Sequence, residues 1–199
     1  MFLEDHQMYY ILVETLSSAI LLIPIFLLLW KVKFHDLGKT AFYTVFAVYL
    51  SAVYFLTGLP TVRFFRFDVS LNLIPFAGMA ADLKNEIKNV LLFIPLGILL
   101  PLLWEKYRTI KDTLLFGLGM TLAIELLQLF TYRATDINDI ITNFLGTVIG
   151  YFLFAILQKK VPSVVKAGKR NDVFLIVVIV FAVMFFVQPL IVSFIYSAT

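Results

Sequence analysis

The sequence predicts an all-α fold, a polytopic bundle of six transmembrane helices with both chain termini outside. Of its 199 residues, 61% are hydrophobic and only 15% are charged, whereas a soluble domain is close to half apolar and a quarter charged. The apolar residues also form long runs, which spanning helices require because lipid offers a backbone amide no hydrogen-bond partner outside its own helix. Composition and run length together exclude an ordinary water-soluble domain.

The apolar runs are long enough to cross a bilayer, since about 20 residues at ~1.5 Å each span a ~30 Å hydrocarbon layer. We expect helices at residues 8–30, 40–59, 87–104, 113–132, 137–157 and 173–195, in a single membrane domain over residues 1–199. The third run contains Pro95 and Pro101, so neighbouring helices must satisfy the carbonyls that these prolines leave free. Residues 1–7 contain no Lys or Arg, so we expect the first run to be a retained helix and not a signal peptide.

The basic residues predict the orientation of the helices. Most of them follow the first, third and fifth runs: Lys31, Lys33, Lys39, Lys106, Arg108, Lys111, Lys159, Lys160, Lys166, Lys169 and Arg170. The positive-inside rule places these connections in the cytoplasm and therefore both termini outside. The net charge is only +3 and there are no cysteines, so we expect no nucleic-acid partner and no disulfide or thiol chemistry.

Residues 60–86 form the one long connection that we expect between helices. Arg63 and Arg66 alternate there with phenylalanines. Such a segment suits the headgroup layer, with the rings in the interface and the guanidinium groups on phosphates. We therefore expect Arg63 and Arg66 to contact lipid headgroups.

The fourth run carries a polar stripe. Thr121, Glu125, Gln128 and Tyr132 are spaced 4, 3 and 4 residues apart and so share one helix face. Glu125 lies about 10 Å from the outer end at the helical rise, where a carboxylate costs on the order of 3 kcal/mol if it faces lipid. Gln128 and Glu125 are also suited to interhelical hydrogen bonding, but a neutral residue would serve that purpose, so we favour a functional role for Glu125.

The fifth run has a matching stripe of Asp136, Asp139, Asn143, Gly146 and Gly150. Its glycines are typical of close helix packing. Asp136 is also a suitable helix N-cap, with Asp139 in the first turn, and capping does not exclude a site role. Oxygen ligands from Asp136, Asp139 and Asn143 could hold a divalent cation, although the spacing alone does not establish a metal site and we expect no cofactor.

Four motifs resemble the VanZ-like family of membrane proteins. They are NLIPF at 72–76, NVLLFIPLG at 89–97, ELLQLF at 125–130 and RATDINDIITNFLG at 133–146. The resemblance implies a family core at about residues 40–158, with additional helices at 8–30 and 173–195. It also implies a multi-pass protein of the bacterial plasma membrane, associated with low-level resistance to teicoplanin-type lipoglycopeptides but not necessarily to vancomycin.

Our first functional hypothesis is a binding protein whose outward-facing polar pocket holds an amphiphile, either a lipoglycopeptide or a lipid-linked cell-wall precursor, among the membrane lipids. Its head would contact Asn72, Asn89, Glu125, Gln128, Arg133, Asp136, Asp139 and Asn143. The alternative is an intramembrane enzyme acting on lipid headgroups or lipid-linked precursors, with Glu125, Asp136 and Asp139 as candidate catalytic residues. A transporter is the third hypothesis, but the sequence has no internal repeat. The sequence does not indicate the oligomeric state.

Glu14 and Gln188 are two further polar residues in apolar runs. Glu14 could complete the outward-facing pocket. We favour the simpler interpretation for both residues, an ordinary polar patch in the outer leaflet.

Overall fold

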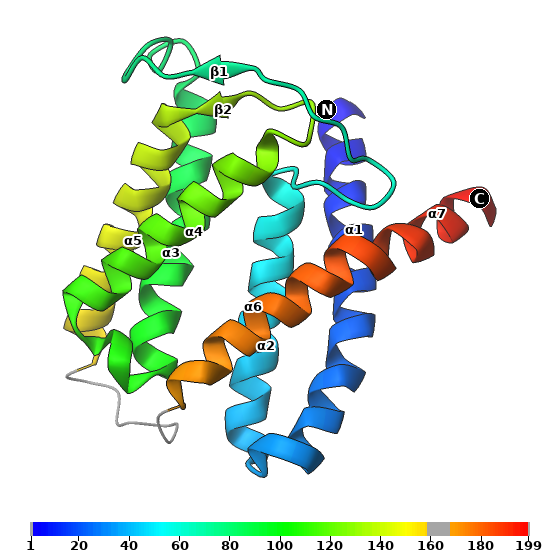
Figure 1. Ribbon diagram of the computed structural model, residues 1–199, viewed down its shortest axis with the longest axis vertical. Helices are drawn as coiled ribbons and strands as arrows, with labels where there is room; N and C mark the ends of the chain where they lie inside the picture. The colour runs from blue at the N-terminus through cyan, green and yellow to red at the C-terminus, as the bar shows by residue number, and fades with distance from the viewer. Residues whose placement is uncertain (1, 159–167, 199) are drawn as a thin grey trace. The chain divides into compact units, whose positions relative to one another are not determined.

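The computed structural model describes residues 2–158 and 168–198 (Figure 1). Its elements are α1 (Phe2–Leu29), η1 (Trp30–Phe34), α2 (Leu37–Leu56), β1 (Leu71–Asn72), α3 (Leu83–Leu103), η2 (Glu105–Arg108), α4 (Ile110–Gln128), β2 (Thr135–Asp136), α5 (Ile137–Leu157), α6 (Arg170–Ala182), η3 (Val183–Val187) and α7 (Gln188–Ala198). Among the described residues the only strands are the two-residue β1 and β2. The predicted helical fold is therefore confirmed.

Within the described residues, five stretches are long and apolar enough to cross a membrane. They are Val13–Phe34, Leu37–Leu56, Leu83–Leu103, Ile137–Leu157 and Asn171–Phe194. The predicted span at 113–132 is helical only as α4, which contains Lys111, Asp112 and Glu125 and is more polar than these five. Crossing by α4, and hence the count of six and the orientation, stay predictions. Lys159, Lys160 and Lys166, which contribute to the predicted orientation, lie outside the described residues.

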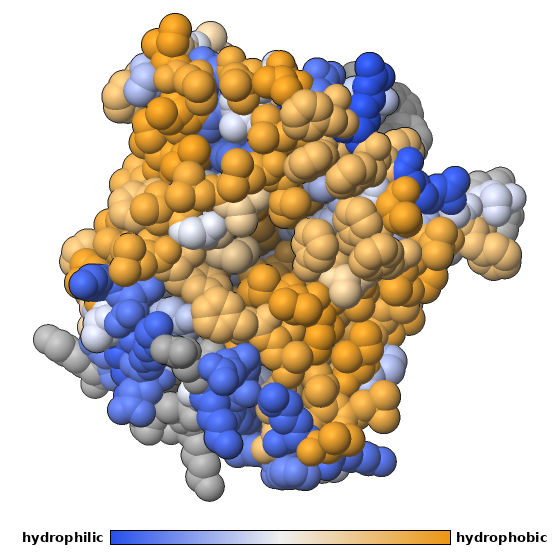
Figure 2. Space-filling view, viewed as in Figure 1, coloured by the Kyte–Doolittle hydropathy of each residue, from blue (hydrophilic) through white to orange (hydrophobic). Residues whose placement is uncertain are grey.

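The surface agrees with a membrane environment. Large hydrophobic side chains such as Leu91, Leu126 and Ile156 are exposed on α3, α4 and α5. Figure 2 shows that hydrophobic side chains cover most of the visible face. A soluble monomer rarely exposes so large an apolar area, and lipid would cover it here.

The chain divides into two compact units, Met1–Phe65 with Asn171–Thr199, and Arg66–Arg170. In the first unit, the buried Ser18 of α1 and Ser51 of α2 share a hydrogen bond of 2.8 Å. Tyr43 of α2 donates a hydrogen bond of 3.1 Å to Asp172 of α6, and both residues are buried. Buried polar pairs therefore join three helices of this unit.

The second unit is built on the close packing of α3 against α5. A Cβ atom added to Gly146 would lie 2.3 Å from the carbonyl oxygen of Val90, and one added to Gly150 would lie 2.1 Å from that of Ile94. Gly97 meets α5 from the other side, since its added Cβ would lie 2.2 Å from the carbonyl oxygen of Thr147. The prediction that Gly146 and Gly150 serve packing is confirmed.

Candidate functional site

A short parallel strand pair forms one wall of the candidate site. Leu71 pairs with Thr135, and Asn72 pairs with Asp136. The backbone N–H of Thr135 also donates to the carbonyl oxygen of Ser70 at 2.9 Å. This pairing holds the loop before α3 against the connection between α4 and α5, at the end of the unit where α3 and α5 begin (Figure 1).

The cavity beside this strand pair has a volume of about 310 Å³ and lies wholly within the second unit. Polar side chains from the loop, from the beginning of α3 and from the beginning of α5 dominate its wall. The lining residues are Asn72, Ala77, Gly78, Asp82, Asn85, Glu86, Arg133, Ala134, Asp136, Asn138 and Asp139. Of the eight residues predicted to bind a ligand, Asn72, Arg133, Asp136 and Asp139 therefore share one cavity.

Hydrogen bonds fix the two aspartates of this group. The Asn72 amide donates to Asp136 Oδ2 at 2.9 Å, and the Asn89 amide donates to Asp139 Oδ1 at 2.8 Å. Asp136 also caps α5, because its Oδ1 accepts the backbone N–H of Asn138 at 2.8 Å. The capping interpretation of Asp136 is thus confirmed, and the same residue lines the cavity. Asn89 does not line the cavity itself, and it positions Asp139 through this hydrogen bond.

Glu125 lies behind the cavity wall and is not among the lining residues. Its side chain is only 3% exposed, and its Oε2 accepts the backbone N–H of Asp136 at 2.9 Å. Thr135 adds a hydrogen bond of 3.0 Å from its hydroxyl to the Glu125 carbonyl oxygen. These contacts tie the end of α4 to the strand that precedes α5. The position of Glu125 therefore suits a structural role better than direct contact with a ligand in this cavity.

Gln128 and Asn143 are also buried, at 1% and 2% exposed, and neither lines the cavity. The Asn143 amide donates to the hydroxyl of Thr121 on α4 at 3.1 Å. Asn143 therefore has a different role from Asp136 and Asp139, with which it could have held a cation, although we expected no cofactor. In the described part of the chain, no group of three or more His, Cys, Asp and Glu residues is arranged to hold a metal ion.

Asn138 is a lining residue that we did not predict. It is fully buried, its Oδ1 accepts the backbone N–H of Phe76 at 2.7 Å, and its amide donates to the carbonyl oxygen of Ala77 at 2.9 Å. Phe76 has a φ of 64° and Gly78 a φ of 72°, so this loop makes a tight turn that Asn138 fixes. The sequence offered one signal for this residue, since Asn138 lies two residues after the helix-capping residue Asp136.

Two acidic residues, Asp82 and Glu86, also line the cavity, and we did not predict them as site residues. They lie at the beginning of α3, which starts at Leu83, four residues earlier than expected. Acids near a helix N-terminus are a usual start signal, and this signal would have extended the predicted helix. Glu86 is 8% exposed, and its Oε2 accepts no hydrogen bond from any described residue.

The cavity has a strongly acidic wall. Four carboxylates line it, from Asp82, Glu86, Asp136 and Asp139, and Arg133 is the only basic residue among its lining residues. Like charges repel in such a confined site, and ionised carboxylates only accept hydrogen bonds. The site therefore suits a ligand rich in hydroxyl, amide or ammonium donors better than a polyanion.

The two arginines of the long connection lie in different units. Arg66 belongs to the second unit, where its guanidinium carbon lies 5.5 Å from the centre of the Tyr132 ring. Arg63 belongs to the first unit and lines a different cavity there. Lipid contact by either residue stays a prediction.

Comparison with known proteins matches this part of the chain to a protein family. The model of the family described as VanZ/LLP1 matches residues 41–158, which include every residue that lines the acidic cavity. "Protein VanZ" of Enterococcus faecium is 36% identical over 91 residues, covering 45% of this chain and 55% of that protein. The chain thus matches about half the length of this curated relative. No solved structure matches.

Proposed function

The chain belongs to the VanZ/LLP1 family, and on that premise we propose that it is a multi-pass protein of the bacterial plasma membrane that gives low-level resistance to teicoplanin-type lipoglycopeptides. The five apolar stretches support the membrane location. The name of the Enterococcus faecium relative supports the link to the VanZ proteins. The resistance itself rests on the resemblance to that family.

We further propose that the acidic cavity binds the polar head of the lipoglycopeptide from the outer side of the membrane. The observation that carries this proposal is the wall of four carboxylates with the side-chain amides of Asn72 and Asn85. Carboxylate and amide oxygens accept hydrogen bonds from sugar hydroxyls and peptide N–H groups. The pyrophosphate of a lipid-linked precursor would meet these carboxylates with only Arg133 to offset them, so we favour the lipoglycopeptide.

The test is direct binding of teicoplanin to the purified full chain in nanodiscs, with and without the substitutions Asp82→Asn and Glu86→Gln. Both changes keep side-chain size and remove a carboxylate from the cavity wall. Since a hydrogen bond to a charged group contributes about 1.5–3 kcal/mol, we expect the double variant to bind at least about tenfold more weakly. Calorimetric titration provides the measurement.

The matched control is Asp68→Asn, which removes an exposed acid of the same unit that does not line the cavity. This control should bind teicoplanin like the unmodified protein. In cells, the double variant should lower teicoplanin resistance while vancomycin susceptibility stays the same. Absence of teicoplanin binding by the unmodified protein would refute the proposal. If the double variant bound teicoplanin as tightly as the unmodified protein, the acidic cavity would not be the binding site.

A further inference from the structure

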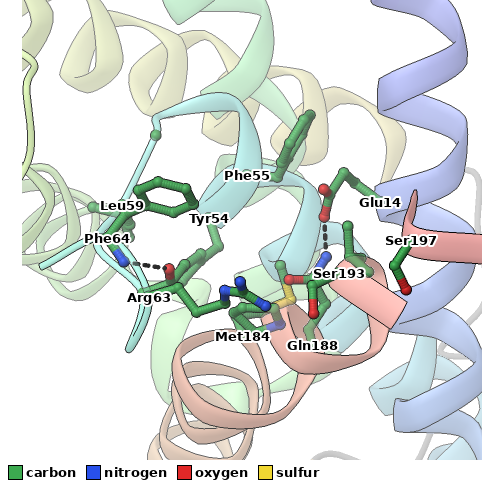
Figure 3. A pocket seen from close by; sticks show the side chains of 14 residues that line it. Glu14, Tyr54, Phe55, Leu59, Arg63, Phe64, Met184, Gln188, Ser193 and Ser197 are labelled. Atoms are coloured by element: carbon green, nitrogen blue, oxygen red, sulfur yellow. Dashed lines mark hydrogen bonds between the residues drawn. The ribbon is translucent and has the colours of Figure 1, made fainter. Parts of the chain in front are cut away.

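The first unit contains a second and larger cavity, with a volume of about 610 Å³ (Figure 3). Its walls come from α1, from the end of α2 with the loop that follows, and from η3 with α7. The volume lies within the range of roughly 300–1,000 Å³ that is usual for small-molecule sites. Two of its polar lining residues, Glu14 and Gln188, fall outside the part of the chain that the family model matches.

Most of the wall is apolar. Phe55 and Leu59 contribute from α2 and its loop, and Met184 and Val192 from η3 and α7. Figure 3 shows Phe55 and Met184 on different sides of the space that these segments enclose. An apolar wall of this kind suits an acyl chain, which would gain free energy in proportion to the apolar area removed from water.

Two side chains of opposite charge face the same cavity. Glu14 is half-buried on α1, and its Oε2 accepts a hydrogen bond from the amide of Gln188, which is 4% exposed. Arg63 is exposed and reaches the cavity from the loop after α2 (Figure 3). Among the described residues no ion pair joins Arg63 to Glu14. The cavity therefore offers one carboxylate and one guanidinium to a ligand that carries both charges.

The position of these charges along the helices agrees with a lipid headgroup. The apolar stretch Leu37–Leu56 ends beside this cavity, because Leu59 and Arg63 of the loop that follows it line the same space as Glu14. The cavity therefore lies near the end of a possible span, where headgroups meet the hydrocarbon layer. The π turn of η3 directly precedes Gln188, and π turns within helices are frequent at functional sites.

We propose that this cavity binds a zwitterionic phospholipid of the phosphatidylethanolamine type. The ammonium group of the headgroup lies at Glu14, and the phosphate accepts hydrogen bonds from the guanidinium of Arg63. One acyl chain follows the apolar wall formed by Leu59, Met184 and Val192. An anionic phospholipid without an ammonium group satisfies Arg63 but leaves Glu14 facing a negative headgroup, so it binds more weakly.

The test uses the purified full chain and native mass spectrometry with phosphatidylethanolamine and phosphatidylglycerol of identical acyl chains. We expect the unmodified protein to retain phosphatidylethanolamine in preference. Glu14→Gln should weaken phosphatidylethanolamine binding about tenfold or more and leave phosphatidylglycerol binding unchanged or stronger, whereas Arg63→Gln should weaken both. Arg108→Gln and Glu105→Gln, which change exposed charges outside this cavity, should leave both affinities unchanged.

A third variant tests the location of the acyl chain. Ser193→Trp fills the cavity from α7 without changing a charge and should abolish the binding of both lipids. Equal retention of the two lipids by the unmodified protein would overturn the proposed ligand. Unchanged phosphatidylethanolamine binding in Glu14→Gln, Arg63→Gln or Ser193→Trp, with an unchanged circular dichroism spectrum, would overturn the proposed site. None of these outcomes bears on the acidic cavity of the second unit.

Discussion

At the scale of single residues, Asn138 determines the shape of the acidic cavity. Its fully buried side chain accepts a hydrogen bond from the backbone N–H of Phe76 and donates one to the carbonyl oxygen of Ala77. The loop that carries Asn72 and Asp82 therefore depends on a residue from α5 for its conformation. This dependence makes Asn138 a residue whose removal should affect both stability and binding.

We predict that Asn138→Ala destabilises the protein by about 1–3 kcal/mol, because two partly buried backbone groups lose hydrogen bonds that contribute roughly 0.5–1.5 kcal/mol each. Unfolding in increasing denaturing detergent, followed by circular dichroism, measures the change. The control is Gln158→Ala, which removes an exposed amide after α5. A loss below about 0.5 kcal/mol in Asn138→Ala would show that water replaces the amide and that the loop does not depend on it.

The polar residues of the candidate site could be predicted only in part from the sequence. Helical spacing places Asp136, Asp139 and Asn143 on one face of α5, but only the first two line the cavity, because α4 covers Asn143. Glu125 does not line the cavity either, because its carboxylate accepts a hydrogen bond from the backbone N–H of Asp136, in the segment after α4. Spacing gives the face of a helix, whereas the neighbour that covers each turn of that face depends on long-range packing.

At the scale of elements, the pair α3 and α5 holds the second unit together through backbone contact. Carbonyl oxygens of Val90 and Ile94 lie where side chains of Gly146 and Gly150 would begin. Small residues allow such close approach between membrane helices, where dispersion and hydrogen bonding replace the hydrophobic effect. The cavity wall comes from the beginning of these two helices, so their separation sets its width.

We predict that Gly146→Ala or Gly150→Ala destabilises the protein by at least about 1–3 kcal/mol, the usual cost of overpacking. The cost should reach or exceed this range because the added Cβ would lie 2.3 Å or 2.1 Å from a backbone oxygen, which cannot rotate away. Gly119→Ala is the matched control on α4, since nothing lies within 4 Å of its added Cβ. It should be neutral or stabilising by up to about 1 kcal/mol.

Detergent-induced unfolding of the three variants gives the comparison. Equal unfolding midpoints for Gly146→Ala and Gly119→Ala would mean that α3 and α5 can move apart without loss of stability. Weaker teicoplanin binding by Gly146→Ala is also expected, because widening the space between the helices moves Glu86 away from Asp139. The control variant should keep its affinity.

The sequence predicts most helices within a few residues but misses the features that depend on distant contacts. The expected helix at 137–157 agrees with α5, whereas α4 ends at Gln128 and not at residue 132. The strand pair β1 and β2 has only two residues on each side. Such a pair has no periodic pattern of its own, because it forms only where two loops meet.

At the scale of the whole molecule, the number of membrane crossings decides which side of the membrane the acidic cavity faces. α4 has 19 residues, or about 28 Å at the helical rise, which nearly matches a ~30 Å hydrocarbon layer. Its charged residues reduce its apolar character, but Lys111 and Asp112 lie at its beginning and Glu125 is buried within the unit. The cost of exposing these charges to lipid is therefore small, and we expect α4 to cross.

We predict that the two ends of α4 lie on opposite sides of the membrane, with the later end outside. The chain contains no cysteine, so Lys111→Cys and Tyr132→Cys each introduce one thiol at an exposed or partly exposed position beside an end of α4. A membrane-impermeant maleimide should label Tyr132→Cys in intact cells and Lys111→Cys only after permeabilisation. Labelling of both in intact cells would place α4 along the surface, and the reverse pattern would turn the acidic cavity to the cytoplasm, where an external lipoglycopeptide could not reach it.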